Sequence, residues 1–206
     1  MSENSIKKHR RSIRLQGFDY AQEGMYFFTI CTYKRQLLFG NVTNGEMKLN
    51  EFGHVVCDEW HKSTTMRHEL DLDTFIVMPN HMHGIVRLKD PNIVGATGGS
   101  PSPFGPSKHS LGAFIAGFKS TITKRVNEIR GTPEARIWQR NYYEHVIRGE
   151  ESLNRIREYI LNNPAQWDFD PENPAAGELP KTHELKEWRY AEGDQPVAPT
   201  KDVRNT

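Results

Sequence analysis

Two histidines stand one residue apart in the stretch IVMPNHMHGIVRL, residues 76–88. Side chains alternate across a β-strand, so His81 and His83 share one face while Met82, between them, points to the other. The two residues then lie roughly 6 to 7 Å apart at the backbone, close enough for both rings to reach one metal ion. The pattern predicts a pair of metal ligands. The alternative, two histidines satisfied by neighbouring polar groups, stays open at this point.

The other face of the same strand is apolar and indicates which side of the sheet is packed. It carries Met82, Val86 and Leu88, so we expect it to lie against helices. The histidine face, which also carries Arg87, is then expected to project from the uncovered side of the sheet.

A metal site needs a third protein ligand, and the segment REYILNNP, residues 157–164, offers one. Tyr159 and Asn163 are four residues apart, a spacing that makes them neighbours on a helix surface. They flank an apolar stripe that includes Ile156 and Ile160, so packing this stripe leaves the phenol and the amide together at its edge. Simple structural use, a helix tyrosine at a packed edge and an asparagine before a proline, is the other interpretation.

Hydrophobic patterning predicts the elements that must position these groups. The stretch 38–50 contains turn formers and no clear element. We predict strands over 24–34, 70–78, 81–89 and 136–147, and helices over 51–66, 111–129 and 150–163. The order βαββαβ followed by one more helix predicts an α+β fold on the ferredoxin-like plan. This is an antiparallel sheet with helices on one face, plus an additional C-terminal helix that carries the tyrosine.

Length and charge distribution predict one main domain between two charged segments. The net charge of +1 conceals an uneven distribution, because residues 108–148 carry eight Lys or Arg and only three Asp or Glu. We divide the chain into a basic N-terminal segment over 1–23, a domain over 24–167 and an acidic, poorly ordered tail over 168–206. The Gly-, Pro- and Ser-rich stretch 90–108 is expected to be a loop. Such asymmetry favours an anionic partner.

Two cysteines, Cys31 and Cys57, form neither a disulfide framework nor a CxxC metal motif, so we expect buried thiols. No apolar run is long enough for a membrane span, and no apolar stretch follows the basic N-terminus as in a secretory signal. The expected location is the cytoplasm, with no membrane partner.

Three blocks of the sequence together resemble a known family. "MPNHMHGIV", "WQRNYYEHVIR" and "REYILNNP", in that order and spacing, resemble the REP-associated tyrosine transposases, which are single-tyrosine HUH transposases related to small insertion-sequence transposases. The similarity runs from about residue 10 to residue 167. Each block alone is a weak signal, whereas three in register over one predicted fold form a specific one.

The resemblance implies a role for each candidate residue. His81 and His83 match the histidine pair that holds the metal, Tyr159 matches the nucleophilic tyrosine, and Asn163 matches a third metal ligand. The implied reaction is metal-dependent cleavage and strand transfer of single-stranded DNA through a 5′-phosphotyrosine, with Mg²⁺ or Mn²⁺ as the ion. The implied partner is DNA carrying palindromic repeats that form hairpins, and the protein would act as a monomer or a homodimer.

Further residues are predicted to support this activity. Tyr143 and His145, on the last strand, are candidates for a second layer around the site. Tyr142 and Tyr143 also compete with Tyr159 as the nucleophile. Basic side chains in three segments are expected to contact DNA phosphates. These are Arg10, Arg11, Arg14, Arg87, Lys119, Lys124, Arg125 and Arg140. A noncatalytic protein that binds repeat hairpins through the same basic residues is the rival interpretation, and retention of the histidine pair, tyrosine and asparagine argues against it.

Overall fold

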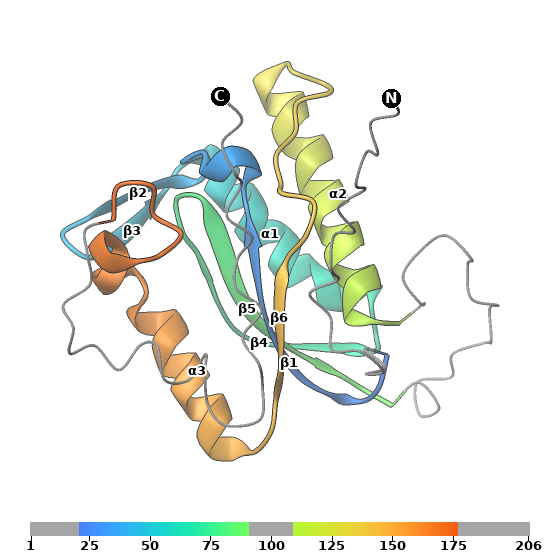
Figure 1. The fold of residues 1–206 in the computed structure, drawn as a ribbon. Helices are drawn as coiled ribbons and strands as arrows, with labels where there is room; N and C mark the ends of the chain where they lie inside the picture. Colours follow the sequence, from blue (N-terminus) through green and yellow to red (C-terminus); the bar gives the residue numbers. More distant parts are fainter. Residues whose placement is uncertain (1–20, 91–108, 177–206) are drawn as a thin grey trace, which may run out of the picture. The chain divides into compact units, whose positions relative to one another are not determined.

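The computed structural model describes residues 21–90 and 109–176, which form the arrangement drawn in Figure 1. Arg10, Arg11 and Arg14, the predicted loop after residue 90, and the tail beyond residue 176 lie outside the described residues. Within the described part, an antiparallel sheet is combined with helices, so the α+β class is confirmed.

Four strands form the main sheet in the order β4-β5-β1-β6. They are β1 (Gly24–Cys31), β4 (Leu70–Val77), β5 (His81–Leu88) and β6 (Tyr143–Ile147). Every neighbouring pair is antiparallel, and β1 and β5, the two central strands, pair along their full lengths from Gly24 opposite Leu88 to Cys31 opposite His81. The histidine strand therefore lies inside the sheet.

Two helices cover one face of this sheet, and a third helix lies against the other (Figure 1). Helix α1 (Glu51–Met66) and helix α2 (Leu111–Arg130) are capped by Asn50 and Ser110. Each cap side chain accepts a hydrogen bond from the backbone N–H three residues further along the chain. Helix α3 (Glu150–Asn162) packs against β4 and β5. The three predicted helices correspond to these segments to within a residue at each end.

Aromatic rings fill the core between the sheet and the first two helices. Trp60 of α1 lies 5.1 Å from the ring of Phe75 and 6.0 Å from that of Phe28, measured between centroids. Phe114 of α2 contacts both Phe28 and Trp60. These rings leave no room for a side chain at Gly84, where an added Cβ would lie 2.8 Å from Phe28 and 3.0 Å from Trp60.

Substitution of Gly84 by alanine is therefore expected to destabilise the fold by about 1–3 kcal/mol, since the rings must shift to admit a methyl group. Gly24→Ala is the matched control on the neighbouring strand, because its Cβ would meet Tyr26 at an ordinary 3.5 Å. Urea unfolding followed by tryptophan fluorescence measures both variants. Equal stability of the two would contradict the packing described here.

The structure corrects the predicted elements in three places. The stretch 38–50 is not featureless, since it contains a small antiparallel hairpin, β2 (Gly40–Thr43) and β3 (Glu46–Leu49). The strand predicted over 136–147 is limited to β6, because Trp138 makes only an isolated bridge to Thr32 before the chain turns. Short 3₁₀ helices follow β1 and α3, namely η1 (Tyr33–Arg35) and η2 (Pro164–Phe169).

The folded part also extends beyond the predicted boundary at residue 167. Asp170 and Glu172, which the sequence suggested were part of a poorly ordered tail, are 4% and 8% exposed. Cys31 and Cys57 are free thiols, as expected, although both are half-buried rather than buried.

Candidate active site

The two histidines of β5 lie on one face of the strand, as their spacing predicted. Their β1 partners in the ladder are Cys31 for His81 and Thr29 for His83. Both imidazoles are fully buried, so the expectation that they project from an uncovered face is wrong. The reason is that α3 packs against this part of the sheet and the chain beyond it brings Asp170 close to His81.

The imidazoles face each other through their Nε2 atoms, which are 3.1 Å apart. The Nδ1 atom of His81 lies 2.9 Å from Oδ1 of Asn80, and Nδ1 of His83 lies 2.8 Å from Oγ1 of Thr29. An amide oxygen can only accept a hydrogen bond, so Nδ1 of His81 carries the proton and its Nε2 presents a lone pair. A partner on Nδ1 that fixes the ring is the usual support of a metal-binding histidine.

The separation of the two Nε2 atoms fits a shared ion. With metal–nitrogen distances of about 2.0–2.1 Å, two ligands at a right angle are about 3.0 Å apart and two tetrahedral ligands about 3.4 Å apart. The observed 3.1 Å lies between these values. The pair therefore needs little rearrangement to bind a cation through both lone pairs.

Asp170 supplies a third donor that the sequence analysis missed. Its Oδ2 lies 3.9 Å from Nε2 of His81, and one donor atom each from His81, His83 and Asp170 lies within 4.8 Å of the others. All three residues are buried. The only sequence signal was the acidic composition just after residue 167, which has no periodicity that could have pointed to a site.

Asn163 joins the same group through Asp170. Its Nδ2 donates to Oδ2 of Asp170 at 2.8 Å, and the asparagine is 2% exposed. Its Oδ1 is buried and has no hydrogen-bond partner among the described residues. A buried amide oxygen without a donor is costly, and a nearby cation would satisfy it. The donor set of two imidazoles and a carboxylate suits a divalent ion.

Tyr159 brings a hydroxyl group to this cluster. Its Oη lies 3.3 Å from Nε2 of His83, and the two rings are 5.2 Å apart between centroids. The ring also meets Phe27 edge-on at 6.3 Å, and the side chain is half-buried. The two parts of the sequence that carried the chemistry, separated by 76 residues, thus meet in the folded chain.

The helix that carries Tyr159 is positioned by its ends and by one ion pair. Gly149 makes the turn from β6 into α3 with a φ of 85°, a conformation that a side chain would disfavour. Ile156 and Ile160 are buried beneath the helix. On its flank, Arg157 donates to both carboxylate oxygens of Asp73 on β4, at 2.9 and 2.5 Å. This bidentate pair fixes α3 on the sheet.

The Arg157–Asp73 pair makes stability depend on acid pH. The Arg157 hydrogen bond lowers the pKa of Asp73 from 3.8 to about 2. A carboxyl group with a depressed pKa stabilises the fold above its ordinary pKa, and this contribution disappears as the pH falls from 3.8 toward 2. Asp73→Asn should therefore cost about 1 kcal/mol at neutral pH and progressively less below about pH 4.

Chemical denaturation at a series of pH values measures this difference between wild type and Asp73→Asn. The control is Glu151→Gln, which removes an exposed pair with Arg155 on the same helix and should change stability by less than about 0.5 kcal/mol. A difference for Asp73→Asn that is constant down to about pH 2 would show that the pair does not titrate as described.

Tyr143 and His145 lie on the same face of the sheet as the histidines. In the β1–β6 ladder Tyr143 is opposite Thr29 and His145 is opposite Phe27. The ring of Tyr143 meets Phe27 at 6.0 Å, and Phe27 in turn contacts both His83 and Tyr159. Tyr143 thus shares a contact with Phe27, which suits a supporting position beside the cluster.

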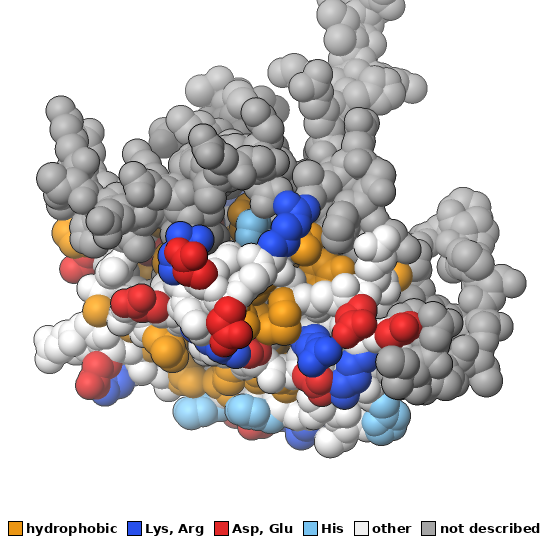
Figure 2. All heavy atoms as spheres, turned by 90° about the horizontal axis from the view of Figure 1, so that it is seen from below, with side chains coloured by type: hydrophobic (Ala, Val, Ile, Leu, Met, Phe, Trp, Pro, Cys, Tyr) orange, Lys and Arg blue, Asp and Glu red, His pale blue; other side chains and the backbone are white. Residues whose placement is uncertain are grey.

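Four of the five basic residues that were predicted to contact DNA and that the structure describes have partners within the chain. Arg87 pairs with Glu23, Lys124 with Glu128, and Arg125 with Asp58 and Glu59. Arg140 is exposed. Figure 2 shows the same mixing on one face of the molecule, where acidic side chains lie among the basic ones. On this face the described residues therefore mix the two signs of charge.

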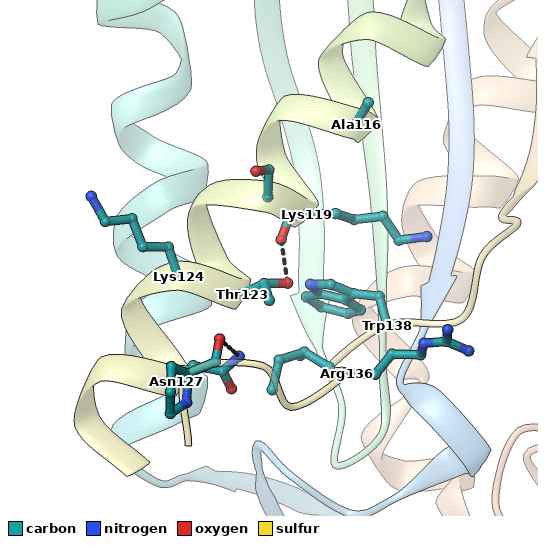
Figure 3. A pocket seen from close by; sticks show the side chains of 10 residues that line it. Ala116, Lys119, Thr123, Lys124, Asn127, Arg136 and Trp138 are labelled. Atoms are coloured by element: carbon teal, nitrogen blue, oxygen red, sulfur yellow. Dashed lines mark hydrogen bonds between the residues drawn. The ribbon is translucent and has the colours of Figure 1, made fainter. Parts of the chain in front are cut away.

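Lys119 differs most from its predicted role. Its Nζ donates to the backbone oxygens of Gln139 and Asn141, and burial lowers its pKa to about 8. It thus fixes the chain ahead of β6. A hollow of about 510 Å³ lies beside it, between α2 and residues 133–138 (Figure 3). Lys124 extends away from Trp138 in this view, and the hollow shares no residue with the histidine and tyrosine cluster.

Comparisons with known proteins add the family. No family model matches the chain. An uncharacterised protein of Haemophilus influenzae (strain ATCC 51907 / DSM 11121 / KW20 / Rd) is 36% identical over 167 residues, which span 79% of this chain and 92% of the relative. A second protein of the same strain, named "Putative REP-associated tyrosine transposase", is 24% identical over 84% of this chain and 81% of its own length.

Two solved structures resemble the fold more distantly. One is a REP-associated tyrosine transposase bound to a REP hairpin, with a TM-score of 0.49, 21% identity and coverage of 81% of this chain and 74% of its own. The other, a "putative transposase" from Deinococcus radiodurans R1, has a TM-score of 0.42, 17% identity and coverage of 72% and 95%.

The chain described here thus places a buried histidine pair beside a helical tyrosine. It belongs to the family of REP-associated tyrosine transposases. Among the described residues, no helix is both long and apolar enough to cross a bilayer.

Proposed function

We propose that this protein is a metal-dependent, single-tyrosine DNA nickase and strand transferase of the HUH type. The observation that carries the proposal is the hydroxyl of Tyr159, which lies 3.3 Å from Nε2 of His83 within a buried set of metal-type ligands. The strand order β4-β5-β1-β6, with two helices on one face, supports a ferredoxin-like plan in this proposal, with α3 as the added helix.

The ion in this proposal is Mg²⁺ or Mn²⁺. His81, His83 and Asp170 would hold it, and the Oδ1 of Asn163 is a further candidate ligand. When bound, a divalent ion polarises the scissile phosphate and neutralises the charge that develops on its oxygens. Two imidazole ligands favour Mn²⁺ by affinity, whereas carboxylate and amide oxygens suit Mg²⁺ as well.

Tyr159 is the nucleophile in the proposed step. Its deprotonated oxygen attacks phosphorus as the bond from phosphorus to the 3′ oxygen breaks. The phenolic proton passes to solvent, and the departing 3′ oxygen takes up a proton to become a free hydroxyl. The DNA remains joined to Tyr159 as a 5′-phosphotyrosine, and the 3′-hydroxyl of another strand reverses the step and completes the transfer.

The substrate follows from membership of the family. We propose single-stranded DNA with palindromic repeats that form hairpins, acted on in the cytoplasm by a monomer or a homodimer. The contacts to the DNA backbone would come from exposed basic side chains such as Arg140 and from the N-terminal arginines. Lys119 is less suited, since its Nζ already donates to two backbone carbonyl groups. Arg87, Lys124 and Arg125 would have to exchange a carboxylate partner for a phosphate.

The test uses end-labelled oligonucleotides that carry a repeat hairpin from the host genome with single-stranded flanks. With Mg²⁺ or Mn²⁺ the full-length protein should cut a flank and form an adduct that survives denaturation in SDS, and EDTA should abolish both products. An oligonucleotide whose stem cannot pair is the control. Tight hairpin binding without cleavage under any divalent ion would instead identify a noncatalytic repeat-binding protein.

A further inference from the structure

Asn80, the residue before the histidine pair, makes hydrogen bonds in two directions. It is fully buried in the turn between β4 and β5. On one side its Oδ1 meets Nδ1 of His81 at 2.9 Å. On the other side its Nδ2 donates to the backbone oxygen of Glu172 at 2.6 Å, across 92 residues of sequence. One amide therefore connects the histidine strand with the segment that carries Asp170.

The orientation of this amide is fixed by its neighbours. The carbonyl of Glu172 and, at 3.4 Å, that of Arg35 can only accept hydrogen bonds, so the NH₂ group must face them. The amide oxygen is then directed to His81, whose Nδ1 must donate. A flipped amide would set its single oxygen against the two carbonyl oxygens, at the cost of buried acceptors without a donor.

The segment 170–172 is held by several contacts. The backbone N–H of Glu172 donates to Oδ1 of Asp170 at 2.6 Å and Nδ2 of Asn163 donates to its Oδ2 at 2.8 Å, so Glu172 and Asn163 together set the direction of the Asp170 carboxylate. From outside, Arg35 donates to the carbonyl of Pro171 at 2.5 Å and pairs with the Glu172 carboxylate at 3.0 Å. The Cys31 thiol donates to the same carboxylate at 3.3 Å.

The thiol contact fits this arrangement, because burial and the nearby carboxylate of Glu172 raise the pKa of Cys31 and keep its proton in place. Cys31 and Arg35 thus bind the Glu172 side chain and the Pro171 carbonyl, whereas Asn80 binds the backbone carbonyl of Glu172. Of these three residues, only Asn80 also makes a hydrogen bond to a histidine of the pair, His81.

We propose that Asn80 is a positioning residue that holds His81 and Asp170 as one unit, so that both donors reach the ion together. This inference rests on the proposed metal site and assigns a role to a residue that never touches the ion. Its amide oxygen keeps Nε2 of His81 unprotonated and aimed at His83, and its NH₂ group keeps the Asp170 segment closed over the pair.

The measurement is Mn²⁺ affinity of the full-length protein without DNA, by isothermal titration calorimetry or by the loss of the free-ion EPR signal. Asn80→Leu, which keeps the branched shape and removes the side-chain hydrogen bonds, should weaken Mn²⁺ binding about 10–100-fold, the usual effect of losing a partner of a metal ligand. Arg35→Met removes a tie to the segment without touching His81 and should give a smaller loss.

The same substitutions in an Asp170→Ala background separate positioning from general damage. If Asn80 acts by holding Asp170, the loss of Mn²⁺ affinity caused by Asn80→Leu should shrink in this background to the part that acts through His81. The loss caused by Arg35→Met should fall to within about twofold of no effect. Asn41→Leu is the matched control, since Asn41 is exposed and its side chain bonds only to Thr43 within the described part of the chain. Thermal unfolding in EDTA checks that each variant is folded.

Two results would overturn the inference while leaving the metal site intact. One is Mn²⁺ affinity within about twofold of wild type in Asn80→Leu, and the other is an equal fold-loss in both backgrounds. Failure of the wild type to bind Mn²⁺ at all would instead remove the proposed metal site, and the inference with it.

Discussion

Replacing Tyr159 with phenylalanine is expected to abolish the covalent DNA adduct and to reduce cleavage by more than about 10³-fold, because the variant lacks the attacking oxygen. The phenyl ring can keep its packing against Phe27 and His83, which lie 6.3 and 5.2 Å away between centroids. Hairpin binding and Mn²⁺ affinity should therefore stay within about threefold of wild type. Adduct formation on a labelled hairpin oligonucleotide, separated in SDS, measures the loss.

Tyr143→Phe is the matched control for this experiment. Tyr143 lies on the same face of the sheet, and its ring, like that of Tyr159, meets Phe27 edge-on. We expect this variant to retain adduct formation. Loss of the adduct in Tyr143→Phe together with normal activity in Tyr159→Phe would identify Tyr143 of β6 as the nucleophile and contradict the assignment of Tyr159.

Removing either histidine is expected to have an effect of similar size. His81→Ala and His83→Ala each delete one of the two Nε2 atoms that face each other at 3.1 Å. Cleavage with Mg²⁺ or Mn²⁺ should fall by more than about 10³-fold, because electrostatic stabilisation of the reacting phosphate is lost. The variants should also lose the increase in the free energy of unfolding that Mn²⁺ gives. In wild type this increase should be about 2.7 kcal/mol at a Mn²⁺ concentration about a hundredfold above Kd.

Thermal unfolding with and without Mn²⁺ measures this loss of metal-dependent stability, and it needs no DNA. His54→Ala, which alters an exposed histidine on α1, is the control and should keep the full shift. Asp170→Ala and Asn163→Ala then rank the remaining donors. We expect the larger loss of Mn²⁺ affinity from Asp170→Ala, since a carboxylate brings a charge to the ion and an amide does not. A wild-type thermal shift in His81→Ala would contradict the site.

The sequence contained enough to predict the positions of the histidine pair and the tyrosine. Alternation along a strand put His81 and His83 on one face, and the helical repeat put Tyr159 and Asn163 at one edge of α3. These are local rules, and tertiary packing did not override them here. The meeting of Tyr159 with His83 could not be derived from either rule, because it depends on how α3 returns across the sheet.

Other parts of the site depend on contacts distant in sequence and were not predictable in the same way. Asp170 follows a 3₁₀ helix and belongs to no periodic pattern, so only its hydrogen bonds with Asn163 and Glu172 reveal its place. The burial of the histidines depends on α3 and the chain that follows it. The pairing of Arg125 with α1 likewise needs the two helices side by side.

One missed element did have a local signal. Asn44 and Gly45 form the turn between β2 and β3, with φ values of 54° and 74°. An Asn-Gly pair with both residues in the left-handed region is a preferred two-residue hairpin turn. The flanking residues alternate in burial along both short strands, so the hairpin could have been predicted.

The central claim is that the hydroxyl of Tyr159 is the atom that becomes joined to DNA. Mass spectrometry of the trapped adduct, after digestion with trypsin and nuclease, tests it directly. The nucleotide should be found on the peptide covering residues 158–181, in which Tyr159 is the single tyrosine. A nucleotide on the peptide covering residues 141–148, which carries Tyr142 and Tyr143, or on no tyrosine at all, would contradict the account.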